Sequence, residues 1–254
     1  MASGHAHLLY RHGDSLVHRL PAHVKLVSLV AFVLIVVATP RERVWAFAGY
    51  VLVLAGVAAA ARLPGLFVLR RMVVEVPFVV FALLMPVVSR GDRVDVFGLA
   101  LSEDGLWSGW NLLAKGTLGV VASIILAATT DARALLLGLQ RLRLPARLVE
   151  IAAFMVRYVD VVAAEMQRMR VARESRAFEA RHLGHARVLA QGAGALFVRT
   201  YERGERVHLA MLSRGYAGSM PLLDVRPVDL RTWATGAALP IAALTVAVAG
   251  WVWL

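Results

Sequence analysis

The chain has 254 residues, 59% of them hydrophobic, with a mean hydropathy of +0.66. This apolar fraction exceeds the roughly 45–50% of soluble domains and indicates an integral membrane protein. The formal net charge is +11, but a nucleic-acid binder is normally a soluble domain with a basic face. Orientation in a membrane and an acidic partner surface explain the charge better. The absence of cysteine excludes a disulfide framework and any cysteine-based metal site.

The first 23 residues are polar and contain five of the eight histidines. Imidazole is a good ligand for late transition metals, but the spacing of these residues fits no compact site. We therefore interpret residues 1–23 as a solvated cytoplasmic tail and assign no metal site to the chain. The five histidines are His5, His7, His12, His18 and His23.

Five apolar segments have lengths close to the ~20 residues that cross a bilayer as a helix. They cover residues 24–39, 44–61, 72–88, 110–130 and 232–254. Residues 62–71 form a short link between the second and third segments, and residues 89–109 form a loop with turn residues and four acids. The sequence therefore predicts an all-α polytopic membrane protein with four spans in residues 24–130 and a fifth at the carboxyl terminus.

Glu75 and Lys115 are the two charged residues well inside these segments. An ionisable residue within a membrane is a functional candidate by default. Both residues lie within about a turn and a half of a span end, so we favour snorkelling or an intramembrane polar pair between them. A proton relay or a substrate site is the alternative.

The distribution of basic residues sets the expected orientation, because short cytoplasmic loops carry an excess of arginine and lysine. We predict a cytoplasmic amino terminus and an external carboxyl terminus, which also places the acidic 89–109 loop outside. The short inner segments then hold Arg11, Arg19, Lys25, Arg62, Arg70 and Arg71, against Arg41, Arg43, Arg90 and Arg93 outside.

Residues 131–231 contain no charge-free run of 18 residues, so we assign them to a cytoplasmic region. Pro145 suits the first turn of a helix, and the polar residues after it recur on one stripe. We predict an amphipathic helix of about 30 residues here, suited to an arm along a membrane surface. A shorter helix over residues 131–142, with Asp131 as its N-cap, precedes it, and another runs from about His185 to Ser213. The stripe consists of Glu150, Arg157, Asp160, Gln167, Arg170 and Glu174.

Two arginine signatures end these long helices: Ser175-Arg176-Ala177 and Ser213-Arg214-Gly215. In one interpretation Gly215 is a left-handed helix cap and Arg214 lies favourably on the helix dipole. In the other, Arg176 and Arg214 reach carboxylates or backbone carbonyls of a soluble partner, which guanidinium groups bind in fork geometry. The two interpretations are compatible, because a cap fixes the direction of the side chain.

The runs Ala172–Ala177 and Ala210–Tyr216 resemble the paired Ala-Arg-Gly signatures of the transmembrane (T) component of energy-coupling factor transporters. Residues 139–145, the pair Arg157-Tyr158 and residues 20–26 also resemble parts of that family. Within the family the chain is most similar to the cobalt-type branch, CbiQ. Ala177 stands where the family usually has glycine, and this difference weakens the cap there. In the first signature, Arg176 is therefore the residue that matches the family's motif.

This resemblance implies a non-catalytic scaffold subunit of an ATP-driven importer in the bacterial inner membrane. Its coupling helices would dock their arginine tips into grooves on two ABC-type ATPase subunits and pass ATPase motion to a separate substrate-binding membrane subunit. ATP would bind the partner chains, and this chain would hold no cofactor. The transported ion would be Co²⁺, with nickel or a vitamin as alternatives. The implied coupling residues are Ser175, Arg176, Ala177, Ser213, Arg214 and Gly215.

Four other classes of protein fit the sequence less well. The chain has no G-x-x-x-x-G-K-[ST] phosphate loop and so does not resemble an ATPase, and it lacks the Glu-Ala-Ala…Gly coupling loop of an ordinary ABC permease. A membrane-bound enzyme would need a constellation such as H-E-x-x-H, which is absent. A secondary transporter is expected to have inverted repeats and broken helices at mid-membrane. Glu75 close to Pro77 is only a weak indication of such a broken helix.

Overall fold

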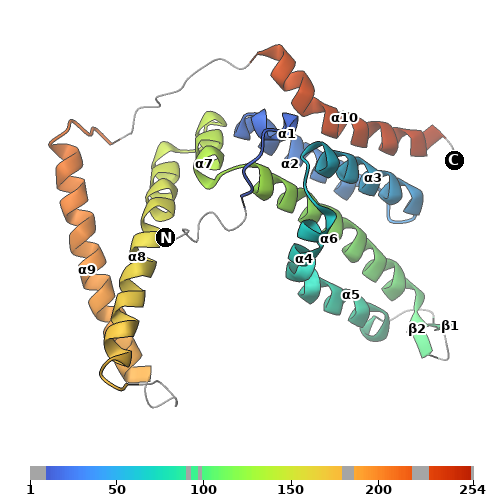
Figure 1. Ribbon diagram of the computed structural model, residues 1–254. Coiled ribbons are helices and arrows are strands. Elements are labelled where there is room, and N and C mark those ends of the chain that lie inside the picture. The colour runs from blue at the N-terminus through green and yellow to red at the C-terminus, as the bar shows by residue number, and fades with distance from the viewer. Residues whose placement is uncertain (1–9, 90–92, 97–98, 179–185, 219–228, 253–254) are drawn as a thin grey trace. The chain divides into compact units, whose positions relative to one another are not determined.

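The computed structural model describes residues 10–89, 93–96, 99–178, 186–218 and 229–252 (Figure 1). In this part of the chain the regular structure is helical apart from one two-stranded hairpin, so the predicted all-α class is confirmed. The described residues fall into two compact units. We call them the apolar unit, within Leu9–Gly138 and Pro227–Leu254, and the arm unit, within Leu139–Arg226.

The apolar unit contains a helical bundle and the hairpin, in which β1 and β2 pair antiparallel with Arg93 opposite Ser102. Helix α7 (Ala132–Arg141) begins in this unit and ends in the arm unit. The remaining elements are α1 (Leu16–Arg19), α2 (Ala22–Ala38), α3 (Val44–Ala60), α4 (Gly65–Arg71), the 3₁₀ helix η2 (Met72–Glu75), α5 (Val76–Val88), β1 (Arg93–Val96), β2 (Leu99–Ser102), α6 (Glu103–Thr129) and α10 (Leu230–Val252).

Three helical stretches of the described residues are long and apolar enough to cross a membrane: Gly65–Val88, Glu103–Thr129 and Leu230–Ala249. Two more apolar helices, α2 and α3, have 17 residues each. That is slightly below the ~20 residues of a full span. Each of the five apolar segments expected from the sequence therefore forms helix over its described residues, and two of the helices are shorter than the other three helical stretches.

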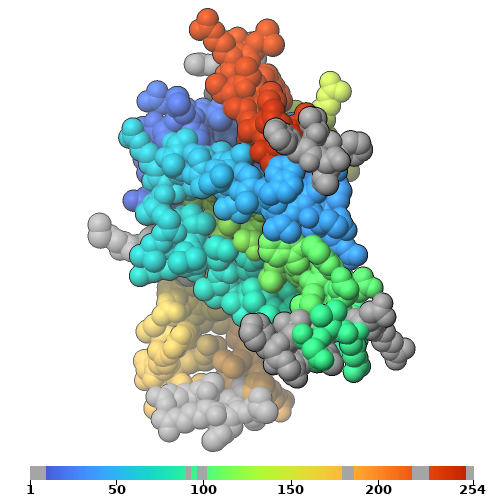
Figure 2. Space-filling model, turned by 90° about the vertical axis from the view of Figure 1, so that its right-hand side faces the viewer, coloured from blue at the N-terminus to red at the C-terminus, as the bar shows by residue number. Residues whose placement is uncertain are grey.

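Side chains of α2, α3, α6 and α10 form the core of the apolar unit. Phe32 and Phe47 each meet the fully buried ring of Tyr50 edge-on at 6.1 Å between centroids. The Tyr50 hydroxyl lies 2.7 Å from Thr39 Oγ1, which satisfies its polar end. Most large side chains of α5 are exposed instead, and in Figure 2 the cyan surface of α4 and α5 is open to view. Such a surface suits contact with lipid or another apolar chain.

Two helices begin earlier in the chain than the predicted spans. The helix before α5 begins at Gly65 rather than Met72, so Arg70 and Arg71 lie in the last turn of α4 instead of in a link. Helix α6 begins at Glu103 rather than Trp110, which removes residues 103–109 from the expected loop. The Ser102 side chain accepts a hydrogen bond from the Gly105 amide at 3.4 Å and thereby caps this helix, with two acids in its first turn.

The arm unit consists mainly of two long helices, α8 (Ala146–Glu174) and α9 (Ala186–Leu212). Their lengths of 29 and 27 residues agree with the two amphipathic helices predicted after Pro145 and about His185. The helices run antiparallel (Figure 1), with Arg199 of α9 against Glu165 of α8. Each has a single buried residue among those described, Val149 in α8 and Leu196 in α9, so most of both arms is open to contact.

Candidate functional site

The two arginine signatures form helix caps with the same hydrogen-bond pattern. At the end of α8, Arg176 N donates to Arg173 O, Ala177 N to Glu174 O, and Phe178 N back to Arg173 O. At the end of α9, the amides of Arg214, Gly215 and Tyr216 donate to Met211, Leu212 and again Met211 in the same order. All six distances lie between 3.0 and 3.2 Å. This pattern is the Schellman motif, in which the amides beyond the helix end satisfy its last carbonyls.

The serine of each signature makes the same local contact. Ser175 Oγ donates to the Ala172 carbonyl at 3.1 Å, and Ser213 Oγ donates to the Ala210 carbonyl at 3.0 Å. The residue after each arginine has a left-handed backbone, with φ of +58° at Ala177 and +83° at Gly215. Gly215 is thus the left-handed cap that the sequence predicts, and Ala177 adopts the same conformation in spite of its Cβ.

Both arginines are exposed, and the antiparallel pairing of α8 and α9 places them at opposite ends of the arm unit. Arg176 follows the last turn of α8. The turn after α9 that holds Arg214 lies beside the start of α8, because the Tyr216 hydroxyl donates to Glu150 Oε2 at 2.8 Å. The 24 residues of helix from Glu150 to Glu174 separate the two ends by roughly 36 Å. Two equivalent guanidinium groups are therefore presented at widely separated points of one helix pair.

Polar contacts hold the two arms together along their length. Glu165 accepts hydrogen bonds from Arg168 on its own helix and from Arg199 Nη1 on α9, the latter at 2.8 Å. The Arg168 and Arg199 guanidinium groups lower the pKa of Glu165 below its ordinary value. At the other contact, the hydrogen bond to Glu150 raises the pKa of the Tyr216 hydroxyl. At neutral pH Glu165 is therefore ionised and Tyr216 is protonated, the states that both contacts require.

Sequence patterns within one helix do not reveal these contacts. Glu165 lies outside the polar stripe predicted for α8, and its partner Arg199 is 34 residues away. Several apolar side chains of α8 are exposed, whereas Val149 is buried. Those above 40% exposure are Leu148, Ile151, Met155, Val159, Met166 and Val171.

Glu75 and Lys115 do not form the pair considered from the sequence. Glu75 is buried in η2 and accepts a hydrogen bond from the Thr117 hydroxyl of α6. Lys115 donates to the Val37 carbonyl of α2 at 2.8 Å. Residues two apart on a helix face different sides, so Thr117 reaches Glu75 while Lys115 is directed to another helix.

The described histidines of the amino-terminal region make structural contacts. His18 lies 2.6 Å from Ser15 Oγ and 3.1 Å from the Arg11 carbonyl, and burial lowers its pKa. The His12 ring contacts Tyr10, and the His23 ring contacts Trp233. His5 and His7 lie outside the described residues. Among the residues that the structure describes, no group of three or more His, Cys, Asp or Glu side chains could hold a metal ion.

Comparison with known proteins gives one family match and several relatives. The model of the family CbiQ, described as cobalt transport protein, matches residues 13–223. The cobalt transport protein CbiQ of Rhodobacter capsulatus is 33% identical over 130 residues, 51% of this chain and 53% of that protein. A protein of unassigned function from Methanocaldococcus jannaschii is 32% identical over 148 residues, 58% of this chain and 55% of its own length.

The chain thus spans about half the length of these two relatives. A longer match is the energy-coupling factor transporter transmembrane protein EcfT of Bacillus subtilis, 25% identical over 225 residues and covering 82% of this chain and 83% of that protein. The family match includes α2–α9 and both arginine caps. The chain therefore belongs to the CbiQ family of cobalt transport proteins.

Proposed function

We propose that this chain is the transmembrane scaffold and coupling subunit of an energy-coupling factor importer, and that Arg176 and Arg214 are its contacts with two ABC-type ATPase subunits. The observation that carries the proposal is the pair of matching caps at opposite ends of α8 and α9. Because the two caps have the same local structure, they suit contacts with two copies of one partner or with two closely related partners. A cap also holds the exposed arginine in a defined direction, which favours fork-shaped contacts with carboxylates or carbonyls.

The arm unit has the mechanical properties that such coupling needs. Its two helices are long, and Glu165, Arg199, Glu150 and Tyr216 tie them to each other. A tied helix pair moves as a body when its ends are displaced. The exposed apolar side chains Leu148, Ile151 and Val171 of α8 offer a surface to a separate substrate-binding membrane subunit, which we propose as the recipient of ATPase motion.

Further proposals follow from the family resemblance and from the relatives. The imported substrate is Co²⁺, ATP is bound and hydrolysed by the partner subunits, and this chain acts without a cofactor of its own. The complex lies in the bacterial inner membrane, with the amino terminus of this chain inside and the carboxyl terminus outside. The names of the CbiQ and EcfT relatives support the transport role.

Charge reversal at the caps tests the coupling role. Arg176→Glu and Arg214→Glu should insert into the membrane normally and lose co-purification with an ATPase subunit, because each repels the acceptor groups that the arginine binds. Arg157→Glu is the matched control, since Arg157 is exposed on the middle of α8 and belongs to neither cap. Normal co-purification of both cap variants with an ATPase subunit would contradict the proposal.

The transport role is tested separately by ATP hydrolysis and metal uptake. The purified chain alone should hydrolyse no ATP, and cells that express it with its ATPase and substrate-binding partners should accumulate Co²⁺. Hydrolysis traceable to this chain would contradict the assignment as a non-catalytic subunit. Accumulation of Ni²⁺ or a vitamin in place of Co²⁺ would keep the coupling role and replace the substrate.

A further inference from the structure

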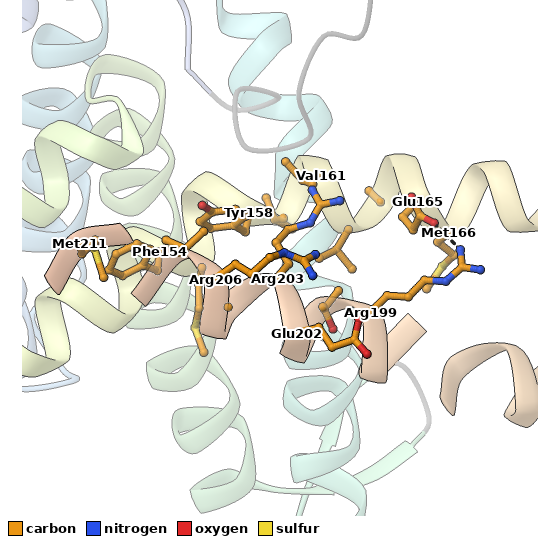
Figure 3. Close-up of a pocket in the computed structure, with 17 residues that line it drawn as sticks. Phe154, Tyr158, Val161, Glu165, Met166, Arg199, Glu202, Arg203, Arg206 and Met211 are labelled. Atoms are coloured by element: carbon orange, nitrogen blue, oxygen red, sulfur yellow. Dashed lines mark hydrogen bonds and ion pairs between the residues drawn. The ribbon is translucent and has the colours of Figure 1, made fainter. Parts of the chain in front are cut away.

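A groove opens between the two arms of the arm unit. Its cavity volume is about 960 Å³, within the range of small-molecule sites. Most of its wall is apolar. Helix α8 contributes Phe154, Tyr158 and Val162, and α9 contributes Val207 and Met211 on the opposite side. Figure 3 shows Phe154, Tyr158 and Met211 among the side chains that line the groove. The groove is therefore suited to an apolar or aromatic body.

Two arginines of α9 supply a positively charged wall. Arg203 and Arg206 are exposed residues that line the groove, and in Figure 3 their side chains extend from α9 toward α8 beside Tyr158. Neither makes an ion pair with an acidic side chain in the part of the chain that the structure describes. Both therefore have guanidinium donors available to a ligand.

The acidic residues of the groove do not neutralise this pair. Glu165 is already engaged by Arg168 and Arg199. The Glu202 carboxylate lies apart from the guanidinium groups of Arg203 and Arg206 in Figure 3. The groove thus combines an apolar wall with two guanidinium groups that have no acidic partner among the described residues. These features suit a ligand with an anionic head and an apolar tail.

We propose that this groove binds an anionic phospholipid of the surrounding membrane, with Arg203 and Arg206 on the phosphate and the acyl chains along Phe154, Tyr158 and Val162. Guanidinium groups bind phosphate oxygens in fork geometry. Amphipathic arms with basic residues hold to anionic bilayers through the same combination of charge and apolar area. Met211 lies at one end of the groove and also accepts the cap hydrogen bonds of Arg214 and Tyr216, whereas Arg203 and Arg206 belong to neither cap. The lipid proposal therefore does not rest on the proposed coupling role of Arg176 and Arg214.

Charge complementarity favours a lipid over a helix of a partner protein as the occupant. A membrane-spanning partner helix is apolar around its circumference and would leave the two guanidinium groups without acceptors, which is unfavourable. A phospholipid satisfies the arginines and the apolar wall with one molecule. The occupant is thus defined by its headgroup charge, and this can be varied independently of its acyl chains.

Native mass spectrometry of the full-length chain, released from nanodiscs of phosphatidylcholine and phosphatidylglycerol, tests the headgroup. The chain should retain phosphatidylglycerol in preference to phosphatidylcholine. The double variant Arg203→Gln/Arg206→Gln should weaken this preference by about thirtyfold, as expected for two basic groups on one anionic headgroup. Arg157→Gln, an exposed arginine of α8 outside the groove, should retain it.

The absence of cysteine permits a direct test of the acyl-chain position. A fluorophore on Val162→Cys should be quenched by brominated phosphatidylglycerol more strongly than by brominated phosphatidylcholine, and the arginine double variant should remove the difference. Equal retention and equal quenching by the two lipids would overturn the proposal. Protection of the thiol in the Val162→Cys variant by the substrate-binding partner, without any effect of lipid charge, would assign the groove to that protein instead.

Discussion

Ala177 and Gly215 occupy the same position in two helix caps, and only the former carries a Cβ. Their φ angles are +58° and +83°, and the amides around them donate to the same relative carbonyls. A left-handed conformation costs an L-residue roughly 1–2 kcal/mol, whereas glycine adopts it freely. The first cap therefore carries a local strain that the second lacks.

Ala177→Gly should stabilise the end of α8 by about 1 kcal/mol, because it removes this strain. Hydrogen exchange of the Ala177 and Phe178 amides measures the change, with slower exchange expected in the variant. Gly215→Ala is the matched opposite change. An added Cβ there meets no atom within 4 Å, so only the backbone conformation opposes it. Faster exchange at position 177 in Ala177→Gly would contradict the prediction.

Lys25 should be more important for stability than Lys115, the other lysine of the chain. The Lys25 ammonium is buried and donates to the Thr129 carbonyl at 2.8 Å and to Thr130 Oγ1 at 3.2 Å, at the carboxyl end of α6. Lys25→Met leaves these groups unsatisfied and should destabilise the apolar unit by about 1–3 kcal/mol. Lys115→Met removes one exposed contact and should cost about 1 kcal/mol or less. Thermal unfolding in one detergent compares them, and equal losses would refute the distinction.

Gly109 should resist substitution because α5 lies directly against it. A Cβ at this position would lie 2.6 Å from the Ala82 carbonyl oxygen, which is backbone and cannot rotate away. Gly109→Ala should destabilise the protein by about 1–3 kcal/mol through overpacking. Gly119→Ala is the control on the same helix, since nothing lies within 4 Å of its added Cβ. A neutral Gly109→Ala in thermal unfolding would show that α5 and α6 separate more easily than this contact implies.

Acid should loosen the contact between α8 and α9 at Glu165. Its pKa is lowered in the folded chain by Arg168 and Arg199, so its contribution is present above the ordinary glutamate pKa of about 4.3. The contribution is lost as pH falls through the lower folded value. Spin labels on Gln167→Cys and Val198→Cys should report a broader distance distribution in this acidic range. Glu165→Gln should show the broad distribution at neutral pH already, and a narrow one there would contradict the assignment.

The sequence predicts helices well where hydropathy or amphipathic period defines them, as in α2, α3, α8 and α9. It misplaces the starts of the helix at Gly65 and of α6 at Glu103 for one reason. The predicted spans begin after charged or turn residues, at Met72 and Trp110, whereas the helices begin at caps and prolines such as Ser102 and Pro64. The cap at Gly215 is a local signal and was predictable.

The contacts that shape the arm unit were not predictable, because they join residues far apart in the chain. The Glu165–Arg199 contact spans 34 residues and the Glu150–Tyr216 contact spans 66. A single sequence shows neither the pairing nor its direction. For the same reason no local signal predicts the arginine wall of the groove, because Arg203 and Arg206 line it only where α9 lies beside α8.

The antiparallel arrangement of α8 and α9 determines how the arm unit responds to force. Glu165 and Arg199 join the two helices near their middle, and Arg176 and Arg214 lie at the two ends. The unit can therefore act as a lever that is loaded at both ends. Displacements of both ends in the same direction translate it, while opposed displacements rotate it about its centre. A partner pair that moves symmetrically toward the centre would instead compress the lever along its axis, and helices resist that deformation most strongly.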